Sequence, residues 1–383
     1  MFFSRKAEGK LVAIIEIQSS VARTSLAWYR PGMHAHILFI DERPIPYKPN
    51  VGSAYFVKTT MKALSESVDA ALRRFRILAK DKQRAGLPKH IAETHYVLSS
   101  PWIASQARTL SLSFDKTTAI TDDKVKEILA AERSKLSPKD SGPLETIEEK
   151  IFEIRLNGYA VSEWHGRQAK ELEISYAVTV GGTDTVRRLR DAAEKIAGSS
   201  NIRFHSSLLL QYIGMRVSMP EKDSYALIHI HGELTDVVIV KHGSCIFFGS
   251  YPMGIGTIVR KIAHATKTDG QTADSLLSLF LGGRLDEAAA KDAGPVMQDM
   301  MSGWSGEFGK LFRDASADLA SVRDAFIISR IHEELFLRSF KAAHPKAHVE
   351  AVGTSEAAPG ITFEPSVGVV RGVSVYAAAL SVI

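Results

Sequence analysis

Residues Tyr225–Thr257 have the sequence YALIHIHGELTDVVIVKHGSCIFFGSYPMGIGT, and the prediction of the fold depends on them. Apolar and β-branched runs separated by polar turns predict three consecutive strands: Ala226–His231, Thr235–Val240 and Ser244–Ser250. The nearly continuous apolar character of the first two runs predicts a sheet covered on both faces. A glycine turn between two strands can present backbone N–H groups to a phosphate. The stretch therefore indicates either a phosphate-binding hairpin or a buried meander with ordinary turns.

The same layout of strands and turns occurs near the start of the chain. Strands are expected there at Leu11–Gln18, Val21–Tyr29 and His36–Ile40. Two such units about 210 residues apart indicate an internal duplication. Apolar residues at spacings of three and four predict a helix over Tyr55–Ala79, which follows the first unit.

The composition is that of a globular protein. The chain has 383 residues, of which 45% are apolar and 24% are charged, and this length predicts two or three domains. The net charge of +5 is spread without a long basic block, which argues against nucleic-acid binding. The single cysteine, Cys245, excludes an intramolecular disulfide framework. There is neither a signal-peptide pattern nor a run of 18 apolar residues, so we expect a soluble, cytoplasmic protein.

Between the two units, the pattern changes to that of a small α+β subdomain. A helix is expected at Lys124–Leu136, capped by the polar residues before it, and strands are expected on either side of it. We therefore predict a first lobe at 1–91, an insert at 92–178, and a second lobe at 179–383. The second lobe is expected to contain a helical subdomain at about 258–320.

Further helices are expected in the last third of the chain. A long amphipathic helix capped by Ser316 is predicted for Ala317–Ala342. A group of large side chains within the preceding helical region is expected to pack in the core rather than to bind a cofactor: Met297, Met300, Met301 and Trp304.

Short motifs span the end of the first strand of each unit and the turn after it. The first is Glu16-Ile17-Gln18-Ser19-Ser20, and the second is HIHGELTD, which ends at Asp236. Pro252-Met253-Gly254 and Val352-Gly353-Thr354-Ser355 follow later strands. With these motifs and this order of elements, nearly the whole chain resembles the FtsA- and PilM-type bacterial actin-like proteins. Those proteins are cytoplasmic factors of cell division and of type IV pilus assembly.

The resemblance implies an α/β protein with a duplicated actin-like (ribonuclease H-like) two-lobe fold. It also implies a small strand–helix–strand–strand insert in place of one actin subdomain. In that family the two lobes close on ATP and magnesium. Carried over by position, Glu16 and Asp236 would be the magnesium ligands. The nucleotide-binding residues would be Glu16, Gln18, Ser19, Ser20, Gly232, Glu233, Thr235, Asp236, Gly254, Gly353 and Thr354.

The motifs depart from the family pattern at functional positions. Glu16 and His229 stand where the family has aspartate, and Gln18 and His231 stand where it has glycine. Magnesium prefers oxygen ligands, and glycine permits the close backbone approach that phosphates need. We therefore expect ATP and Mg²⁺ to bind weakly or not at all, with weak or absent ATPase activity and no assigned catalytic residue.

The two histidines also raise the question of a metal site. His229 and His231 share one face of a strand, but a zinc site would need further ligands from elsewhere, so packing or turn hydrogen bonds are the preferred interpretation.

Three functions are compatible with the sequence. The first is a scaffold of the cell-division or type IV pilus machinery that recruits partners at the inner face of the membrane. The second is an ATP-binding, polymerising actin-like ATPase. The third is a sugar or acyl kinase of the same superfamily, which should carry a catalytic aspartate and well-formed phosphate loops, and neither is evident here.

The expected partner is the cytoplasmic tail of an inner-membrane protein or a division-ring protein, and self-association stays open. Ala377–Ile383 lacks the basic amphipathic character of a membrane-binding helix, so PilM is the closer resemblance and membrane proximity is expected through the partner.

Overall fold

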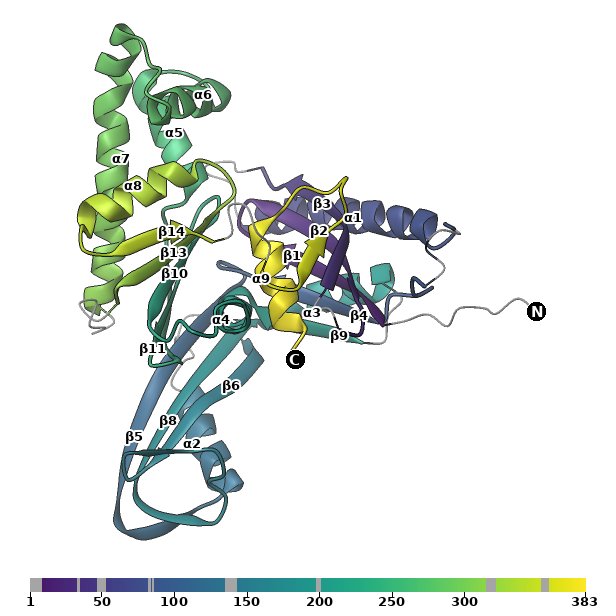
Figure 1. The fold of residues 1–383 in the computed structure, drawn as a ribbon, viewed down its shortest axis with the longest axis vertical. Helices are drawn as coiled ribbons and strands as arrows, with labels where there is room; N and C mark the ends of the chain where they lie inside the picture. Colours follow the sequence, from purple (N-terminus) through teal and green to yellow (C-terminus); the bar gives the residue numbers. More distant parts are fainter. Residues whose placement is uncertain are drawn as a thin grey trace.

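The computed structural model describes residues 9–32, 35–46, 53–81, 84, 86–134, 143–197, 201–314, 322–352 and 358–383. Its strands form three sheets, two of which belong to separate lobes, while the third extends away from both (Figure 1). Within this part of the chain, no helix is long and apolar enough to cross a membrane.

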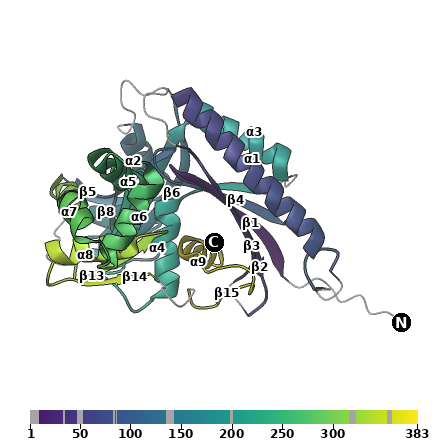
Figure 2. The ribbon, with the colours of Figure 1, turned by 90° about the horizontal axis from the view of Figure 1, so that it is seen from above.

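The first sheet has six strands in the order β15-β3-β2-β1-β4-β9. These strands are β1 (Lys10–Ile17), β2 (Val21–Tyr29), β3 (Ala35–Pro44), β4 (Glu93–Leu98), β9 (Ile202–Ser206) and β15 (Ile361–Phe363). Helices α1 (Ser53–Leu78) and α3 (Thr183–Ala197) lie on one face, as Figure 2 shows. Helix α9 (Arg371–Leu380) covers the other face, where its apolar side chains join the core formed by β1 and β2.

The second sheet repeats the order of the first. Its five strands run β12-β11-β10-β13-β14. They are β10 (Tyr225–Ile230), β11 (Thr235–Lys241), β12 (Ser244–Tyr251), β13 (Asp324–Ser329) and β14 (His348–Ala351). β10 pairs antiparallel with β11 and parallel with β13, just as β1 pairs antiparallel with β2 and parallel with β4. The expected duplication is therefore present in the strand topology.

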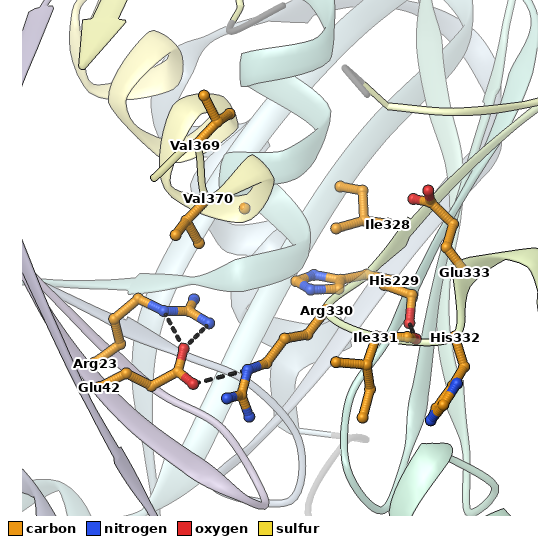
Figure 3. Close-up of a pocket in the computed structure, with 12 residues that line it drawn as sticks. Arg23, Glu42, His229, Ile328, Arg330, Ile331, His332, Glu333, Val369 and Val370 are labelled. Carbon is orange, nitrogen blue, oxygen red and sulfur yellow. Dashed lines mark hydrogen bonds and ion pairs between the residues drawn. The ribbon is translucent and has the colours of Figure 1, made fainter. Parts of the chain in front are cut away.

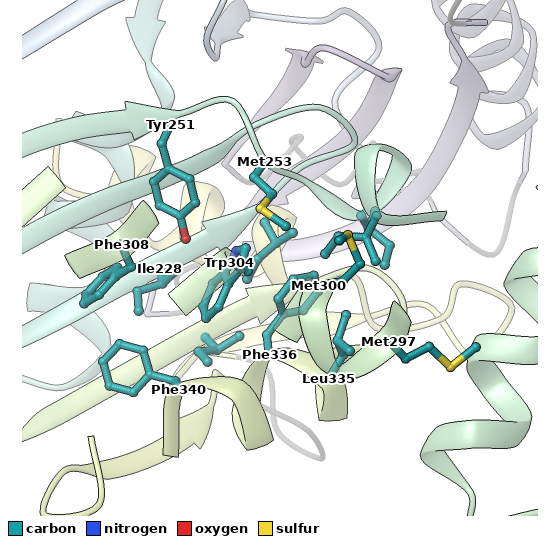
Figure 4. Close-up of a cluster of buried hydrophobic side chains, with 14 of the residues drawn as sticks. Ile228, Tyr251, Met253, Met297, Met300, Trp304, Phe308, Leu335, Phe336 and Phe340 are labelled. Atoms are coloured by element: carbon teal, nitrogen blue, oxygen red, sulfur yellow. The ribbon is translucent and has the colours of Figure 1, made fainter. Parts of the chain in front are cut away.

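Four helices lie on one side of this sheet. They are α5 (Ile255–Thr266), α6 (Gly270–Leu281), α7 (Glu287–Asp314) and α8 (Glu333–Ala343). Trp304 and Phe308 of α7 are fully buried against the sheet, beside Phe336 and Phe340 of α8 (Figure 4). Met297, Met300 and Met301 belong to or pack against the same core, which confirms the packing role predicted for them.

The insert contains a separate four-stranded sheet in the order β5-β8-β6-β7. Its strands are β5 (Ile103–Ile120), β6 (Leu144–Leu156), β7 (Tyr159–Val161) and β8 (Arg167–Gly182), and α2 (Asp122–Ser134) packs on one face. The sheets do not end at the domain boundaries predicted at 91/92 and 178/179. β4 lies in the first sheet between β1 and β9, while β8 of the insert continues to Gly182.

The helix predicted for Ala317–Ala342 is wrong at Asp324–Ser329 and correct from Glu333 onward. Residues 324–329 form the central strand β13, and the helix α8 starts at Glu333. The sequence DAFIIS is apolar on both faces because β13 lies between β10 and β14, and a short apolar run of this kind cannot be distinguished from a buried helix by its periodicity. The proposed cap, Ser316, lies outside the described residues.

Two helices fill the space between the lobes. α4 (Ser207–Ser218) packs along α9. At their crossing, a Cβ added to Gly214 would overlap the carbonyl oxygen of Val375, so the absence of a side chain lets the backbones approach closely.

Candidate functional site

The two hairpin turns that the sequence marks as phosphate loops meet directly between the lobes. The backbone N–H of Glu233 donates to the hydroxyl of Ser19 across 3.2 Å. A Cβ added to Gly232 would overlap both Cβ and Oγ of Ser20. Glycine at position 232 is therefore used for contact between the two turns.

The first loop is built around a buried ion-pair cluster. Glu16 lies opposite Arg23 in the antiparallel register of β1 and β2, which brings both side chains to one face of the sheet. The carboxylate of Glu16 accepts from the amide of Gln18 and from the guanidinium of Arg23. Arg23 also donates to Glu42 from Nε at 3.0 Å and from Nη2 at 2.7 Å. Burial alone would lower the pKa of Arg23, but the carboxylates of Glu16 and Glu42 raise it.

The second loop contains a buried carboxylate with partners on both oxygens. Asp236 is fully buried, and its Oδ1 accepts from the hydroxyl of Ser250 at 2.6 Å. Its Oδ2 lies 2.9 Å from Nε2 of His231. The ring of His231 packs against that of His229, with 4.1 Å between the centroids. The Nδ1 atom of His229 lies 2.9 Å from the side-chain amide of Gln211 on α4.

The remaining predicted residues of the second loop serve the interior of their own lobe. Thr235 donates to the carbonyl of Met253 at 2.7 Å and accepts from the indole of Trp304 at 3.0 Å. Gly232 accepts at its carbonyl from the N–H of Gly256 at 2.7 Å, within the first turn of α5. Backbone carbonyls of the loop thus take up N–H groups at the start of this helix.

Gly254 and Glu233 complete the loop's attachment to α5. A Cβ at Gly254 would overlap the carbonyl oxygens of the loop at His231 and Gly232, so only glycine fits there. Glu233 accepts from Thr257 Oγ1 at 3.1 Å and pairs with Arg260, at 2.8 Å from Nη1. Its carboxylate is therefore held against α5.

A cavity of about 360 Å³ opens beside these loops, between the lobes (Figure 3). Arg23, Glu42 and His229 line it, and so do residues of the segment after β13, including Arg330. Arg330 Nε lies 2.8 Å from Glu42 Oε1, so Glu42 pairs with arginines from both lobes. The mouth carries exposed apolar side chains, Ile331 and Val369.

The sequence motifs do not mark Arg23, Glu42 or Arg330. The one available signal concerns Arg23, which is a charged residue inside the apolar strand Val21–Tyr29. The expected adenosine residues Gly353 and Thr354 lie outside the described residues.

The observed contacts bear on whether magnesium fits. All four carboxylate oxygens of Glu16 and Asp236, the expected ligands, already have hydrogen-bonding partners in the protein. Magnesium demands oxygen ligands in near-ideal octahedral geometry. Within the described ranges, no group of three or more histidine, cysteine or acidic side chains is placed to hold a metal. The donor set therefore does not fit a bound magnesium ion in this conformation.

Burial of His229 predicts a dependence of stability on pH. Burial, the neighbouring His231 and the charge of Arg23 together lower the pKa of His229 well below its ordinary value of 6.5. As the pH falls below about 6.5, His229 in the unfolded chain binds a proton, whereas buried His229 in the folded protein does not. The free energy of unfolding therefore decreases. We expect the unfolding constant of the wild type to rise by up to about tenfold per pH unit relative to His229→Gln. Denaturant titrations between pH 7 and pH 5 measure this, and equal slopes would contradict it.

Comparison with known proteins supports the fold. No protein-family model and no curated protein matches the chain. The structure of the PilM-PilN type IV pilus biogenesis complex is similar, with a TM-score of 0.58 and 12% sequence identity over 97% of this chain and 96% of that chain.

Two further solved structures are less similar. The ethanolamine utilization protein EutJ from Carboxydothermus hydrogenoformans has a TM-score of 0.45 and 7% identity over 96% of this chain and 88% of that chain. A Bacteroides thetaiotaomicron protein with an actin-like ATPase fold and unknown function has a TM-score of 0.35 and 9% identity over 91% of this chain and 94% of that chain. The predicted fold class is confirmed: the chain has the two-lobe α/β fold of the actin-like ATPases.

Proposed function

We propose that this protein is an actin-like scaffold of type IV pilus assembly that acts by binding protein partners and has lost the use of ATP. The state of the phosphate loops is the observation that supports the proposed loss of ATP use. Glu16, the expected magnesium ligand of the first loop, is instead paired with the buried Arg23.

Entry of a triphosphate would require this cluster to open. The charge of Arg23 is already balanced by Glu16 and Glu42, and both carboxylates would repel a phosphate brought close to them. Leaving one member of a buried pair without its partner costs about 3–5 kcal/mol, because its charge is then uncompensated. The direct contact between Gly232 and Ser20 would also have to be broken. Both costs subtract from any affinity for ATP.

The first half of the proposal rests on likeness of fold to the PilM-PilN complex. A partner in the same role would be a peptide from the cytoplasmic tail of an inner-membrane protein, which would bring the scaffold to the membrane. Strand β6 offers an edge for such a peptide. β7 pairs only with Ile154–Leu156, which leaves the preceding stretch of β6 paired on its β8 side alone among the described strands. An extended peptide can add to an open strand edge through backbone hydrogen bonds.

Calorimetric titration of the purified protein with ATP and magnesium tests the nucleotide half. We expect no heat of binding at millimolar nucleotide, because the groups expected to hold phosphate and magnesium are bonded to one another. A saturable isotherm with a dissociation constant below about 1 mM, equivalent to about 4 kcal/mol of binding free energy, would overturn it.

The proposed partner binding is tested with synthetic peptides. They match the cytoplasmic tails of inner-membrane proteins from the source organism. One tail should bind while its scrambled version does not. Failure of every tail would contradict the partner half and would leave the nucleotide result unaffected, so the two halves are tested separately.

A further inference from the structure

Four buried or half-buried side chains form a continuous chain between the first lobe and the insert. Glu93 and His95 lie on β4, His205 lies on β9, and Glu148 lies on β6 of the insert. Glu93 Oε2 lies 3.0 Å from His95 Nε2, and His95 Nδ1 lies 2.9 Å from His205 Nε2. His205 Nδ1 lies 3.1 Å from Glu148 Oε1. Both ring nitrogens of each histidine therefore take part in this row of hydrogen-bonded side chains.

The arrangement is enclosed and fixed at both ends. His95 and His205 are almost fully buried, and their rings lie within 18° of parallel. At one end, the ammonium of Lys10 lies 3.0 Å from Glu93 Oε2. At the other end, the backbone N–H of Ser206 donates to Glu148 Oε2 at 3.1 Å. These outer contacts hold the two carboxylates in place as acceptors.

Counting protons shows that two neutral imidazoles cannot satisfy this chain. Three hydrogen bonds link the four side chains, and each needs one hydrogen between its heavy atoms. Ionised carboxylates only accept, and a neutral imidazole carries one N–H. Two neutral rings supply two hydrogens for three bonds. The third bond requires one additional proton.

We propose that His95 and His205 form a binding site for one proton, so that the pair carries a single positive charge held between Glu93 and Glu148. This buried imidazolium joins the insert to the first lobe, because one of the two carboxylates that it bonds belongs to β6.

The surroundings decide which ring carries the extra charge. Burial lowers the pKa of His95 to about 4, with further lowering by His205 and Arg203, and the opposing effect of Glu93 is insufficient to restore it. His95 therefore stays neutral at physiological pH and donates its N–H to Glu93. With His95 Nε2 donating to Glu93, the other two hydrogen bonds need a hydrogen on each nitrogen of His205, which donates to His95 on one side and to Glu148 on the other.

Loss of this proton would weaken the contact between the domains. Without it, a lone pair of His205 Nδ1 would face Glu148 Oε1 at 3.1 Å, with no hydrogen between them. The folded state binds the proton, so the stability that it contributes is present when the site is occupied and is lost as the pH rises through its titration. The direction is opposite to that expected for His229.

Nuclear magnetic resonance of the full-length protein with ¹⁵N-labelled histidine tests the proposal directly. At neutral pH, the His95 and His205 rings should together show three protonated nitrogens, assigned with His95→Gln and His205→Gln. Two protonated nitrogens in the wild type would overturn the proposal, and this measurement does not depend on any variant remaining folded.

Glu148→Gln is the matched variant. Its side-chain amide can donate to His205 Nδ1, so two neutral rings suffice for all three bonds. We expect two protonated ring nitrogens in this variant. The unfolding constant of the wild type should rise relative to that of Glu148→Gln by up to about tenfold per pH unit as the shared proton is lost. His165→Gln, which changes an exposed histidine paired with the exposed Asp122, should leave the pH dependence as it is in the wild type. Identical pH profiles for the wild type and Glu148→Gln would contradict the proposal.

Discussion

Replacing Arg23 with alanine should lower the free energy of unfolding by about 3–5 kcal/mol. The guanidinium is buried and bonds both Glu16 and Glu42, so its removal leaves the buried carboxylate of Glu16 facing only the amide of Gln18. Removing one partner of a buried ion pair costs far more than the pair itself contributes, because the remaining charge is left without compensation. Chemical denaturation monitored by tryptophan fluorescence measures the change.

Arg43→Ala is the control for this prediction. Arg43 lies on the neighbouring strand β3 and pairs with Asp41, but its side chain is 38% exposed rather than buried, so we expect the unfolding midpoint of Arg43→Ala to stay close to that of the wild type. If Arg23→Ala were as stable as Arg43→Ala, the buried cluster would not hold the first loop, and the main argument against nucleotide binding would fail.

The lobes could be predicted from the sequence because their hairpins are local. Each of β1–β2 and β10–β11 is a pair of adjacent apolar runs with a short turn, and this pattern needs no knowledge of distant residues. Parallel pairings are different. β4 pairs with β1 although β2, β3 and α1 lie between them in the sequence, and β15, near the end of the chain, pairs with β3. The predicted domain boundaries therefore do not follow the sheets.

The candidate site was predicted only where a motif marked it. The turns at Gln18 and Gly232 were identified from their residues, and the substitutions there indicated crowding. The ion pairs that fill the site depend on register and tertiary contact. Arg23 lies opposite Glu16 only once β1 and β2 are paired, and Arg330 reaches Glu42 only once the two lobes are assembled. Neither relation has a sequence spacing that could reveal it.

Gly232→Ala should destabilise the protein by about 1–3 kcal/mol, although the change adds one methyl group. That methyl would overlap Cβ and Oγ of Ser20 in the opposite lobe, and Cβ is fixed to the backbone, so the two turns must separate. The same argument shows that a bulky residue at position 232 would disturb the contact between lobes before it reported on any nucleotide. Thermal and denaturant unfolding of Gly232→Ala measure the cost.

A second substitution identifies the cause. Ser20→Gly removes the atoms that the new methyl would overlap, so the double variant Ser20→Gly/Gly232→Ala should recover most of the loss, with a coupling energy of about 0.5–3 kcal/mol. Gly270→Ala, at the start of α6 where a Cβ would meet no atom within 4 Å, should be neutral or stabilising by up to about 1 kcal/mol. If Ser20→Gly failed to rescue Gly232→Ala, the loss would not arise between the two turns, and the lobes could separate there without cost. Under the proposed function, a closed contact at this point excludes phosphate. The rescue therefore tests the proposed loss of nucleotide binding through the packing of the two turns, independently of the charges around Arg23.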